Sequence, residues 1–295
     1  MLNIQSSGQS AIHIGVIFMT TIPFFKMSGS GNDFIIIDNR DHVIDDANLP
    51  QLIENVCRRR LSAGADGLIL VEASSEADFQ WRFFNSDGGR AEMCGNGARC
   101  AARFAYLNEI TGQRMSFVTD AGKVHAQVLE DQVKIQVTDP VDLKLDYTID
   151  LEKGQISISS INTGVPHVVV PVDRIDDVEV VALGREIRYH KVFAPAGTNA
   201  NFVSPVSDQM FSIRTYERGV EDETLACGTG AVASALIMAT KMQLSSPIHM
   251  MTRSGSCLTV HFSFHNGRFQ EVELEGDARV IYNGALWEDA WNYTL

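Results

Sequence analysis

The chain has 295 residues, which favours two domains, and its 45% hydrophobic and 21% charged residues exclude wholesale disorder. Its formal net charge is −13 at pH 7 with no compensating basic run, so nucleic acid is not an expected partner. The five cysteines lack Cys-x-x-Cys spacing, which indicates neither a disulfide framework nor a zinc module, and we expect a reducing, cytoplasmic setting. No apolar run approaches the ~18–20 residues that cross a bilayer, so no membrane span is expected.

The predicted elements follow an N-terminal extension, residues 1–18, and the folded part is expected to open at Met19. The apolar stretch near the start lacks the basic residues and the cleavage site of a secretory signal, so we interpret it as a short leader or an upstream start. Runs rich in β-branched residues and bounded by turn residues predict strands in the first half at 35–37, 67–71, 80–84, 115–118, 124–129 and 133–137. The same pattern predicts strands in the second half at 157–161, 168–170, 201–203, 211–216, 257–264 and 271–274. Helices are predicted at 98–109 and 231–242, and a closing strand at 278–282 with the tail 287–291 is expected to return to the first half.

Two parts of the chain repeat one pattern at a constant spacing. The sequence GNDF at residues 31–34 precedes a run of isoleucines, and GVPH precedes a run of valines 133 residues later. The sequences CGNGA and CGTGA, which begin at Cys94 and Cys227, are also 133 residues apart. Phe83 falls on Tyr216 at the same offset. One ungapped offset over these landmarks predicts two copies of one fold.

We therefore expect an α+β fold of two pseudo-symmetric repeats, each a curved and mostly antiparallel sheet wrapped around one central helix. The second predicted helix is apolar almost all round, as expected for a helix that is surrounded by strands. The expected division places residues 19–138 together with 273–295 in the first domain, and residues 139–272 in the second.

A cysteine, Cys94 or Cys227, stands just before each predicted helix, among glycines that allow a sharp turn. The first N–H groups of a helix are unpaired and carry partial positive charge. This position is expected to lower the pKa of the thiol from about 8.5 and to form a cup for an anion. A carboxylate could therefore lie between the two helix ends with a thiol on each side. Cys57, Cys100 and Cys257 have no such pairing and are expected to be packing residues.

A symmetric pair of thiols beside a carboxylate suits the racemisation of an α-amino acid without a cofactor. One thiolate removes the α-proton while the thiol on the opposite face delivers another, and the two roles exchange in the reverse direction. Helix N–H groups around the carboxylate would stabilise the carbanion. The alternatives are a hydrolase or thiol–disulfide exchange protein and a non-catalytic amino-acid-binding module. A hydrolase leaves the second turn unexplained, and a binding module requires neither thiol.

Seven motifs span residues 26 to 230: KMxGxGNDF, ADG, FNxDG, CGNGARC, GxPH, ERG and ACGTG. In combination they resemble the motifs of the diaminopimelate epimerase family, and the resemblance covers roughly residues 24–282. It implies a homodimeric isomerase with no pyridoxal phosphate and no metal, which interconverts LL- and meso-diaminopimelate for lysine and peptidoglycan precursor synthesis. The nearest alternatives are related proline or hydroxyproline racemases and phenazine-type isomerases. Arg218 and the asparagines favour a substrate with a second amino-acid head group.

The resemblance also implies a role for each matching residue. Cys94 and Cys227 become the catalytic acid/base residues, with His167 and Glu217 beside them to tune their ionisation and position. Arg218 matches the residue that holds the distal carboxylate, a role that suits its bidentate fork. The other expected substrate-binding residues are Asn32, Asn85, Asn199 and Glu217, with Gly95, Asn96, Gly228 and Thr229 forming the anion cups.

Three positions depart from the family's pattern. Ser28 stands where the family usually has histidine, and little consequence is expected. Val165 stands where many members have asparagine, which removes one expected contact to the distal end of the substrate. Gly67 replaces a glutamine of some relatives, so a contact there would have to come from the backbone or water.

Overall fold

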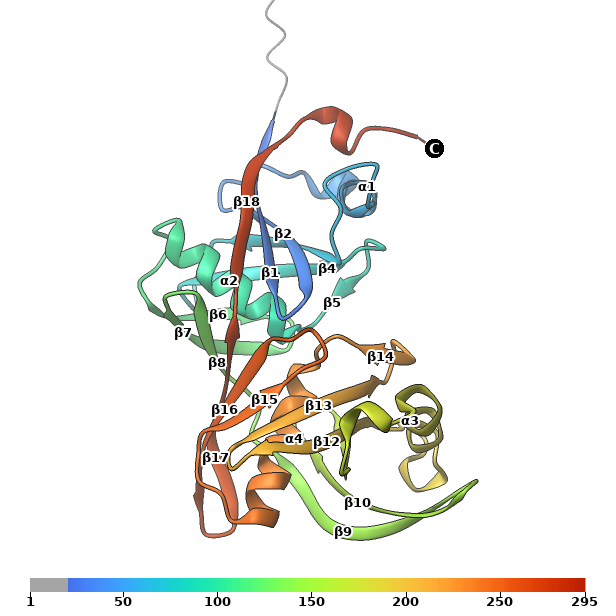
Figure 1. The fold of residues 1–295 in the computed structure, drawn as a ribbon. Coiled ribbons are helices and arrows are strands. Elements are labelled where there is room, and N and C mark those ends of the chain that lie inside the picture. The colour runs from blue at the N-terminus through green and yellow to red at the C-terminus, as the bar shows by residue number, and fades with distance from the viewer. Residues whose placement is uncertain (1–20, 295) are drawn as a thin grey trace, which may run out of the picture.

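The computed structural model describes residues 21–294 and has two stacked halves, one around helix α2 (Gly95–Leu107) and one around helix α4 (Gly228–Met242) (Figure 1). The predicted N-terminal extension, residues 1–18, and the expected start at Met19 lie outside the described residues. Within residues 21–294, no helix is long and apolar enough to span a membrane.

The first half contains one further α-helix and eight strands: α1 (Leu49–Cys57), β1 (Ile22–Gly29), β2 (Asn32–Asp38), β3 (Gly67–Glu72), β4 (Phe79–Asn85), β5 (Arg90–Ala91), β6 (Arg114–Thr119), β7 (Gly122–Leu129) and β8 (Gln132–Gln136). The second half contains α3 (Val180–Arg188), β10 (Gly154–Asn162), β11 (Pro166–Pro171), β12 (Asn199–Ser207), β13 (Met210–Glu217), β14 (Asp222–Thr224), β15 (Ile248–Met251), β16 (Cys257–His265) and β17 (Arg268–Asp277). Two more strands, β9 (Val141–Leu151) and β18 (Arg279–Leu286), follow β8 and β17 in the chain.

The same order of strand pairing occurs in both halves. In the first half, β1–β2 and β3–β4 are antiparallel, β2–β3 and β4–β6 are parallel, and β6, β7 and β8 form an antiparallel series. The strands β10, β11, β12, β13, β15, β16 and β17 pair in the same order and directions. The predicted fold of two pseudo-symmetric repeats is therefore confirmed.

Each half receives its last strand from the end of the other. β9 leaves the first half and pairs with β10, whereas β18 returns from the second half to pair with β1 (Figure 1). The expected return of the closing strand to the first half is thus confirmed. β8 and β17 also pair with each other and join the two halves. The division into two domains stays a prediction, and its boundary at residue 273 falls inside β17.

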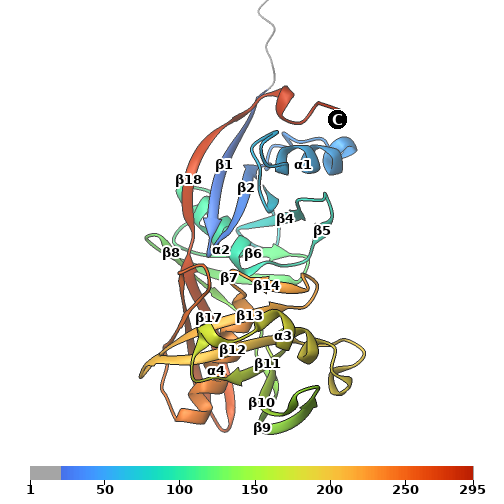
Figure 2. The same ribbon diagram turned by 45° about the vertical axis from the view of Figure 1, so that its right-hand side comes forward.

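Both faces of the central strands are buried, which explains their continuous runs of β-branched residues. Ile35 and Ile37 of β2 pack with α1, while Phe34 and Ile36 of the same strand face the core around α2 and α4. In the second half, α3 covers the outer face in the same way as α1 covers the first (Figure 2). The alternation of side chains along each strand therefore separates a helix-facing core from an outer layer.

Several predicted boundaries were wrong. α2 and α4 begin at Gly95 and Gly228, three residues earlier than predicted, because the glycines belong to the first helical turn. The short helices α1 and α3 and the strands β1, β5, β9, β14 and β15 were not predicted. The repeat is also not fully ungapped: Ile69 pairs with Phe83, and Asn201 pairs with Thr215, so Thr215 rather than Tyr216 is the counterpart of Phe83.

The contact between α3 and β13 gives a test of this packing. A Cβ at Gly184 would lie 2.3 Å from the Cβ of Tyr216, which is fully buried. Gly184→Ala is expected to lower the free energy of unfolding by about 1–3 kcal/mol because the backbone must shift. Urea unfolding measures this change, with Val181→Ala on the exposed face of α3 as the control. An equal effect of the two substitutions would contradict the packing.

Candidate active site

Three neighbouring strands of the second half end beside the N-terminus of α4. Val169, Val203 and Ile213 pack in the core that contains α4, so residues at alternate positions of the same strands share this face. These residues are His167 on β11, Asn199 and Asn201 on β12, and Thr215 and Glu217 on β13. The strands that pack on α4 through apolar side chains therefore present polar side chains at its N-terminal end.

The first half presents the corresponding strands to α2. Phe34, Ile69 and Phe83 lie in the core, and the next residues on this face, toward the strand ends, are Asn32, Gly67 and Asn85. A Cβ at Gly67 would lie 2.6 Å from the carbonyl oxygen of Phe84 and 2.7 Å from the ring of Phe83. The position therefore leaves no space for a side chain in this protein.

Each candidate thiol belongs to the N-cap residue of its helix. Cys94 and Cys227 have extended backbones, and their carbonyl oxygens accept the first helical hydrogen bonds from Ala98 and Ala231 at 2.8 and 2.9 Å. Neither side chain makes a capping hydrogen bond to its own helix. The predicted placement of both cysteines directly before a helix is confirmed.

The expected lowering of the thiol pKa values was wrong. Burial and, next, the Glu217 carboxylate raise the pKa of Cys227 to about 12, although the Thr229 hydroxyl and the N–H of Gly230 oppose this rise. Burial also raises the pKa of Cys94, although helix N–H groups and Arg99 oppose it. Removal of water therefore outweighs the helix N-terminus at both sites.

The two thiols lie within electrostatic range of each other. The charge of Glu217, in the second half, raises the pKa of Cys94 in the first half, and Cys94 in turn raises the pKa of Cys227. The turn at Gly31 reaches across the boundary, because a Cβ there would lie 3.3 Å from the Leu225 side chain. α2 also contacts α4, so the two cysteine turns belong to helices that pack against each other across the boundary between the halves.

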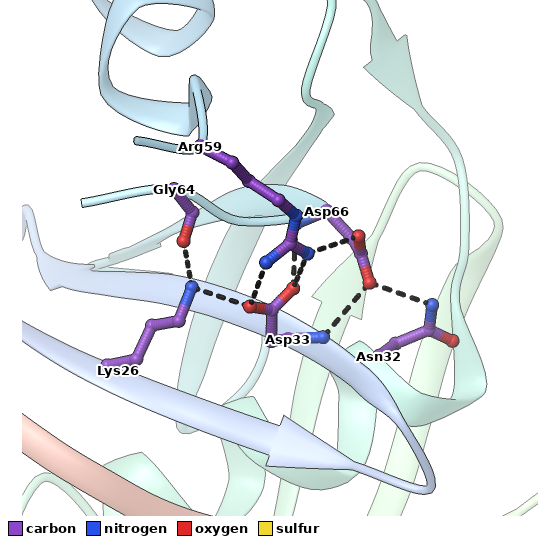
Figure 3. A network of polar contacts seen from close by, with 6 residues as sticks. All are labelled: Lys26, Asn32, Asp33, Arg59, Gly64 and Asp66. Carbon is purple, nitrogen blue, oxygen red and sulfur yellow. Dashed lines mark hydrogen bonds and ion pairs between the residues drawn. The ribbon is translucent and has the colours of Figure 1, made fainter. Parts of the chain in front are cut away.

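An ion-pair network holds the loop that carries Asn32 (Figure 3). The Asp33 carboxylate accepts from Lys26 at 2.8 Å and from both terminal nitrogens of Arg59 at 2.6 and 3.0 Å. Arg59 also pairs with Asp66, whose other oxygen accepts from Asn32 Nδ2 at 3.1 Å. The hydrogen bond from Asn32 Nδ2 to Asp66 therefore fixes the orientation of the Asn32 amide.

The other end of the Asn32 side chain reaches the Cys94 turn. Asn32 Oδ1 accepts from Asn96 Nδ2 at 2.7 Å, and Asn96 Oδ1 accepts from the fully buried Arg99 at 2.8 Å. Two predicted substrate-binding residues are thus bonded to each other. The sequence analysis assigned no role to Asp66 or Arg99, although both lie within its motifs.

The second half holds its predicted residues through the backbone. Asn199 accepts from the backbone N–H of Arg218 at 2.8 Å and donates to the carbonyl of Pro166 at 3.1 Å. The Arg218 guanidinium is half-buried and donates to the Ala196 carbonyl at 3.3 Å. Among residues 21–294, no carboxylate lies within ion-pair distance of Arg218.

The remaining predicted residues differ in their placement. The Thr229 hydroxyl lies 3.6 Å from the sulfur of Cys227. Burial raises the pKa of Glu217. The side chains of Thr224 and Cys227 oppose this rise. Asn85 is exposed, and the structure does not bring its side chain into hydrogen-bonding contact with the other predicted residues within the described part of the chain.

His167 lies deepest of the predicted residues. Its ring is 1% exposed, and its Nδ1 atom is 3.1 Å from Nδ2 of Asn201. Burial, and next the charge of Arg218, lower the pKa of His167 to about 3, so the ring is neutral at pH 7. The sequence analysis missed Asn201 and its neighbour Thr215. The signal was present in the alternation of Asn199 and Asn201 with apolar residues along β12.

Comparison with known proteins gives one consistent family. A family model described as diaminopimelate epimerase matches residues 24–143 and 159–279. The chain is 45% identical over 281 residues to a diaminopimelate epimerase of Aquifex aeolicus (strain VF5), covering 92% of this chain and 99% of that protein. It is 40% identical over 277 residues to a diaminopimelate epimerase of Archaeoglobus fulgidus, covering 90% and 93%.

Solved structures of the same fold are more distant in sequence. A phenazine biosynthesis protein of the PhzF family from Bacillus anthracis has a TM-score of 0.68 at 16% identity, covering 91% of this chain and 99% of that chain. A hydroxyproline epimerase from Agrobacterium vitis has a TM-score of 0.63 at 16% identity, covering 93% and 96%. At these identities the likeness concerns the fold.

The Asp33 network predicts a pH-dependent contribution to stability. Burial raises the pKa of Asp33, but Arg59 and Lys26 outweigh it and lower the pKa from 3.8 to about 2. The resulting stabilisation, on the order of 2 kcal/mol, is present above about pH 4 and is lost as the pH falls through about 2. Urea unfolding of Asp33→Asn should therefore show a deficit at pH 7 that shrinks below pH 4. Asp38→Asn, which breaks the exposed pair with Arg40, is the control; a deficit for Asp33→Asn that does not change with pH would contradict the role of the charge.

Proposed function

We propose, on the premise that this chain belongs to the diaminopimelate epimerase family, that Cys94 and Cys227 are the two acid/base residues of its reaction. The membership confirms the resemblance seen in the motifs, and members of this family are isomerases that interconvert LL- and meso-diaminopimelate in lysine biosynthesis. The observation that supports the proposal is that the two thiols belong to the N-cap residues of matched helices, and that these helices contact each other across the halves.

In the proposed mechanism, the α-carboxylate of the substrate lies between the N-termini of α2 and α4. The cups are formed by Gly95 and Asn96 on one side and by Gly228 and Thr229 on the other. Unpaired N–H groups there stabilise the negative charge that develops when the α-proton leaves. Substrate binding also places an ammonium group beside the thiols, and this positive charge opposes the rise of the thiol pKa that burial causes.

The proton transfers balance as follows. The thiolate on one face takes the α-proton, so that an S–H bond forms as the C–H bond breaks. The thiol on the other face gives its proton to the carbanion, so that a C–H bond forms with inverted configuration. The protonation states of Cys94 and Cys227 are exchanged at the end of the turnover, and this arrangement catalyses the reverse direction.

We assign the supporting roles by position. Glu217 is proposed to act beside Cys227, whose thiol it contacts, and to bind the substrate, and His167 is proposed to act as a neutral polar partner. Arg218 is proposed to bind the distal carboxylate, which is supported by the lack of a carboxylate partner among residues 21–294. The distal end of the substrate would also contact Asn32, Asn85 and Asn199.

The same proposal includes the setting of the enzyme. We propose a cytoplasmic homodimer that also supplies peptidoglycan precursor synthesis and requires neither a cofactor, a metal nor a nucleic acid. All five cysteines are free, as expected in a reducing compartment. The outer edge of β18 pairs with no other strand within residues 21–294 and exposes Ile281 and Tyr282, which supports a contact with a second copy.

Removal of either proposed catalytic thiol tests the mechanism. Cys94→Ala and Cys227→Ala should each lower the rate of LL-to-meso conversion by at least about a hundredfold, since one proton transfer loses its acid or base. Chiral chromatography measures the conversion, and Cys257→Ala, a half-buried cysteine on β16, is the matched control. A nearly wild-type rate in either of the first two variants would overturn the two-thiol mechanism.

Arg218→Ala tests recognition of the distal carboxylate. The KM for LL-diaminopimelate should rise roughly 10- to 100-fold because a charge-assisted pair is lost. L-lysine is the control ligand, since it is diaminopimelate without one carboxylate, and its inhibition constant should change little. Equal losses for the two ligands would indicate that Arg218 acts on the structure instead.

A further inference from the structure

His167, Asn201 and Thr215 form a buried row of hydrogen-bonded side chains across β11, β12 and β13. They are 1%, 0% and 3% exposed, and all three face α4. Asn201 Nδ2 lies 3.1 Å from His167 Nδ1, and the Thr215 hydroxyl donates to Asn201 Oδ1 at 2.9 Å. The row therefore links the imidazole ring of His167 on β11, through Asn201 on β12, to Thr215 on β13.

Hydrogen-bond complementarity fixes the orientation of the Asn201 amide. One of its terminal atoms lies 2.8 Å from the carbonyl oxygen of Val168, which can only accept, so that atom is the nitrogen. The same nitrogen donates its second hydrogen to His167 Nδ1. A neutral imidazole that accepts at Nδ1 carries its proton at Nε2. The Nε2–H tautomer of His167 thus follows from the position of one backbone carbonyl.

The Nε2 atom of His167 is buried and has no hydrogen-bond partner within residues 21–294. An unsatisfied buried donor is destabilising, so natural proteins rarely retain one without a use. The row lies beneath the first turn of α4: a Cβ at Gly230 would be 2.3 Å from Asn201 Oδ1 and 3.3 Å from the sulfur of Cys227. The unpaired donor belongs to a side chain at the same end of α4 as this thiol.

The row exists in only one half of the molecule. The register of the strands places Phe34, Ile69 and Phe83 at the corresponding positions of β2, β3 and β4. These three residues are buried and apolar, and the rings of Phe34 and Phe83 pack edge to face. The repeated fold therefore does not require polar residues at these positions.

We propose that Asn201 and Thr215 are positioning residues that hold His167 as a neutral Nε2–H tautomer, so that it serves the reaction as a hydrogen-bond donor to an anionic group in the site. This inference rests on the proposed function for the reaction, but the tautomer itself does not depend on it. Thr215 donates to the oxygen of the Asn201 amide, and the amide nitrogen donates to Val168 and His167, so the Nε2–H of His167 is left for the anionic group. The imidazole acts neither as a base nor as a cation.

Nitrogen NMR of ¹⁵N-histidine-labelled protein tests the tautomer directly, with the His167 signals assigned by their loss in His167→Gln. We expect a proton at Nε2, none at Nδ1, and no titration above pH 5. Saturation with LL-diaminopimelate should shift the Nε2–H signal. A proton at Nδ1, titration near pH 6.5, or a signal that does not respond to the ligand would each overturn the proposal.

Two variants test the positioning roles. Asn201→Asp replaces the donor to Nδ1 by an acceptor, so it should move the proton to Nδ1 and lower kcat on the order of tenfold or more, with a smaller change in KM. Thr215→Val should lower kcat roughly two- to tenfold, whereas Thr215→Ser, which keeps the hydroxyl, should restore it.

Wild-type kcat in Thr215→Val, or equal losses in the valine and serine variants, would contradict the positioning role even if Asn201→Asp failed to fold. Failure of the proposed function is distinguished by a separate result. In that case the wild-type protein would lack epimerase activity, while the NMR spectra would still show the Nε2–H tautomer.

Discussion

The exchange of one strand between the two halves is the constraint on which the candidate site depends. β9 and β18 each leave one half and complete the sheet of the other. At the second crossing, Arg99 and Arg103 of α2 donate to the carbonyl oxygens of Asp277 and Ala278 at 3.3 and 2.5 Å. The helix that follows Cys94 is therefore hydrogen-bonded to the segment that connects the halves. Because of this connection, the proximity of the two helices that carry the cysteine turns is a property of the fold rather than of a loop.

The two halves have the same pairing order but different chemistry beside their helices. The first half places aromatic and aliphatic side chains under α2 and holds Asn32 from outside through charged residues. The second half places His167, Asn201 and Thr215 under α4 and keeps Glu217 near both thiols. A reaction with two exchangeable thiols needs symmetry at the sulfur atoms only. The groups that set the charge around them can then differ: Glu217 of the second half acts on both thiols, and Arg99 of the first half acts on Cys94.

The sequence allowed much of this to be predicted, for physical reasons that can be named. Runs of β-branched residues predicted the buried strands, and the spacing of Cys94 and Cys227 predicted two matched helix ends. α1, α3 and β9 were missed because α1 and α3 have only nine residues each and β9 is mostly exposed, without a clear alternation. The sign of the thiol pKa shifts depends on how much water the packed halves exclude from the thiols. The local sequence around each cysteine does not carry this information. The row of His167, Asn201 and Thr215 depends on the pairing register of the strands. From Asn201 onward this register differs by one residue from the offset of the sequence repeat.

The central claim is that two thiols act on opposite faces of one carbon. It is tested most directly by early-time turnover of LL-diaminopimelate in heavy water, with mass spectrometry of both isomers. The account predicts one deuterium at the inverted carbon of the meso product, while the recovered LL substrate keeps its hydrogen. Deuterium that enters the recovered substrate as fast as the product, or a product that retains the original hydrogen, would indicate a single base and contradict the claim.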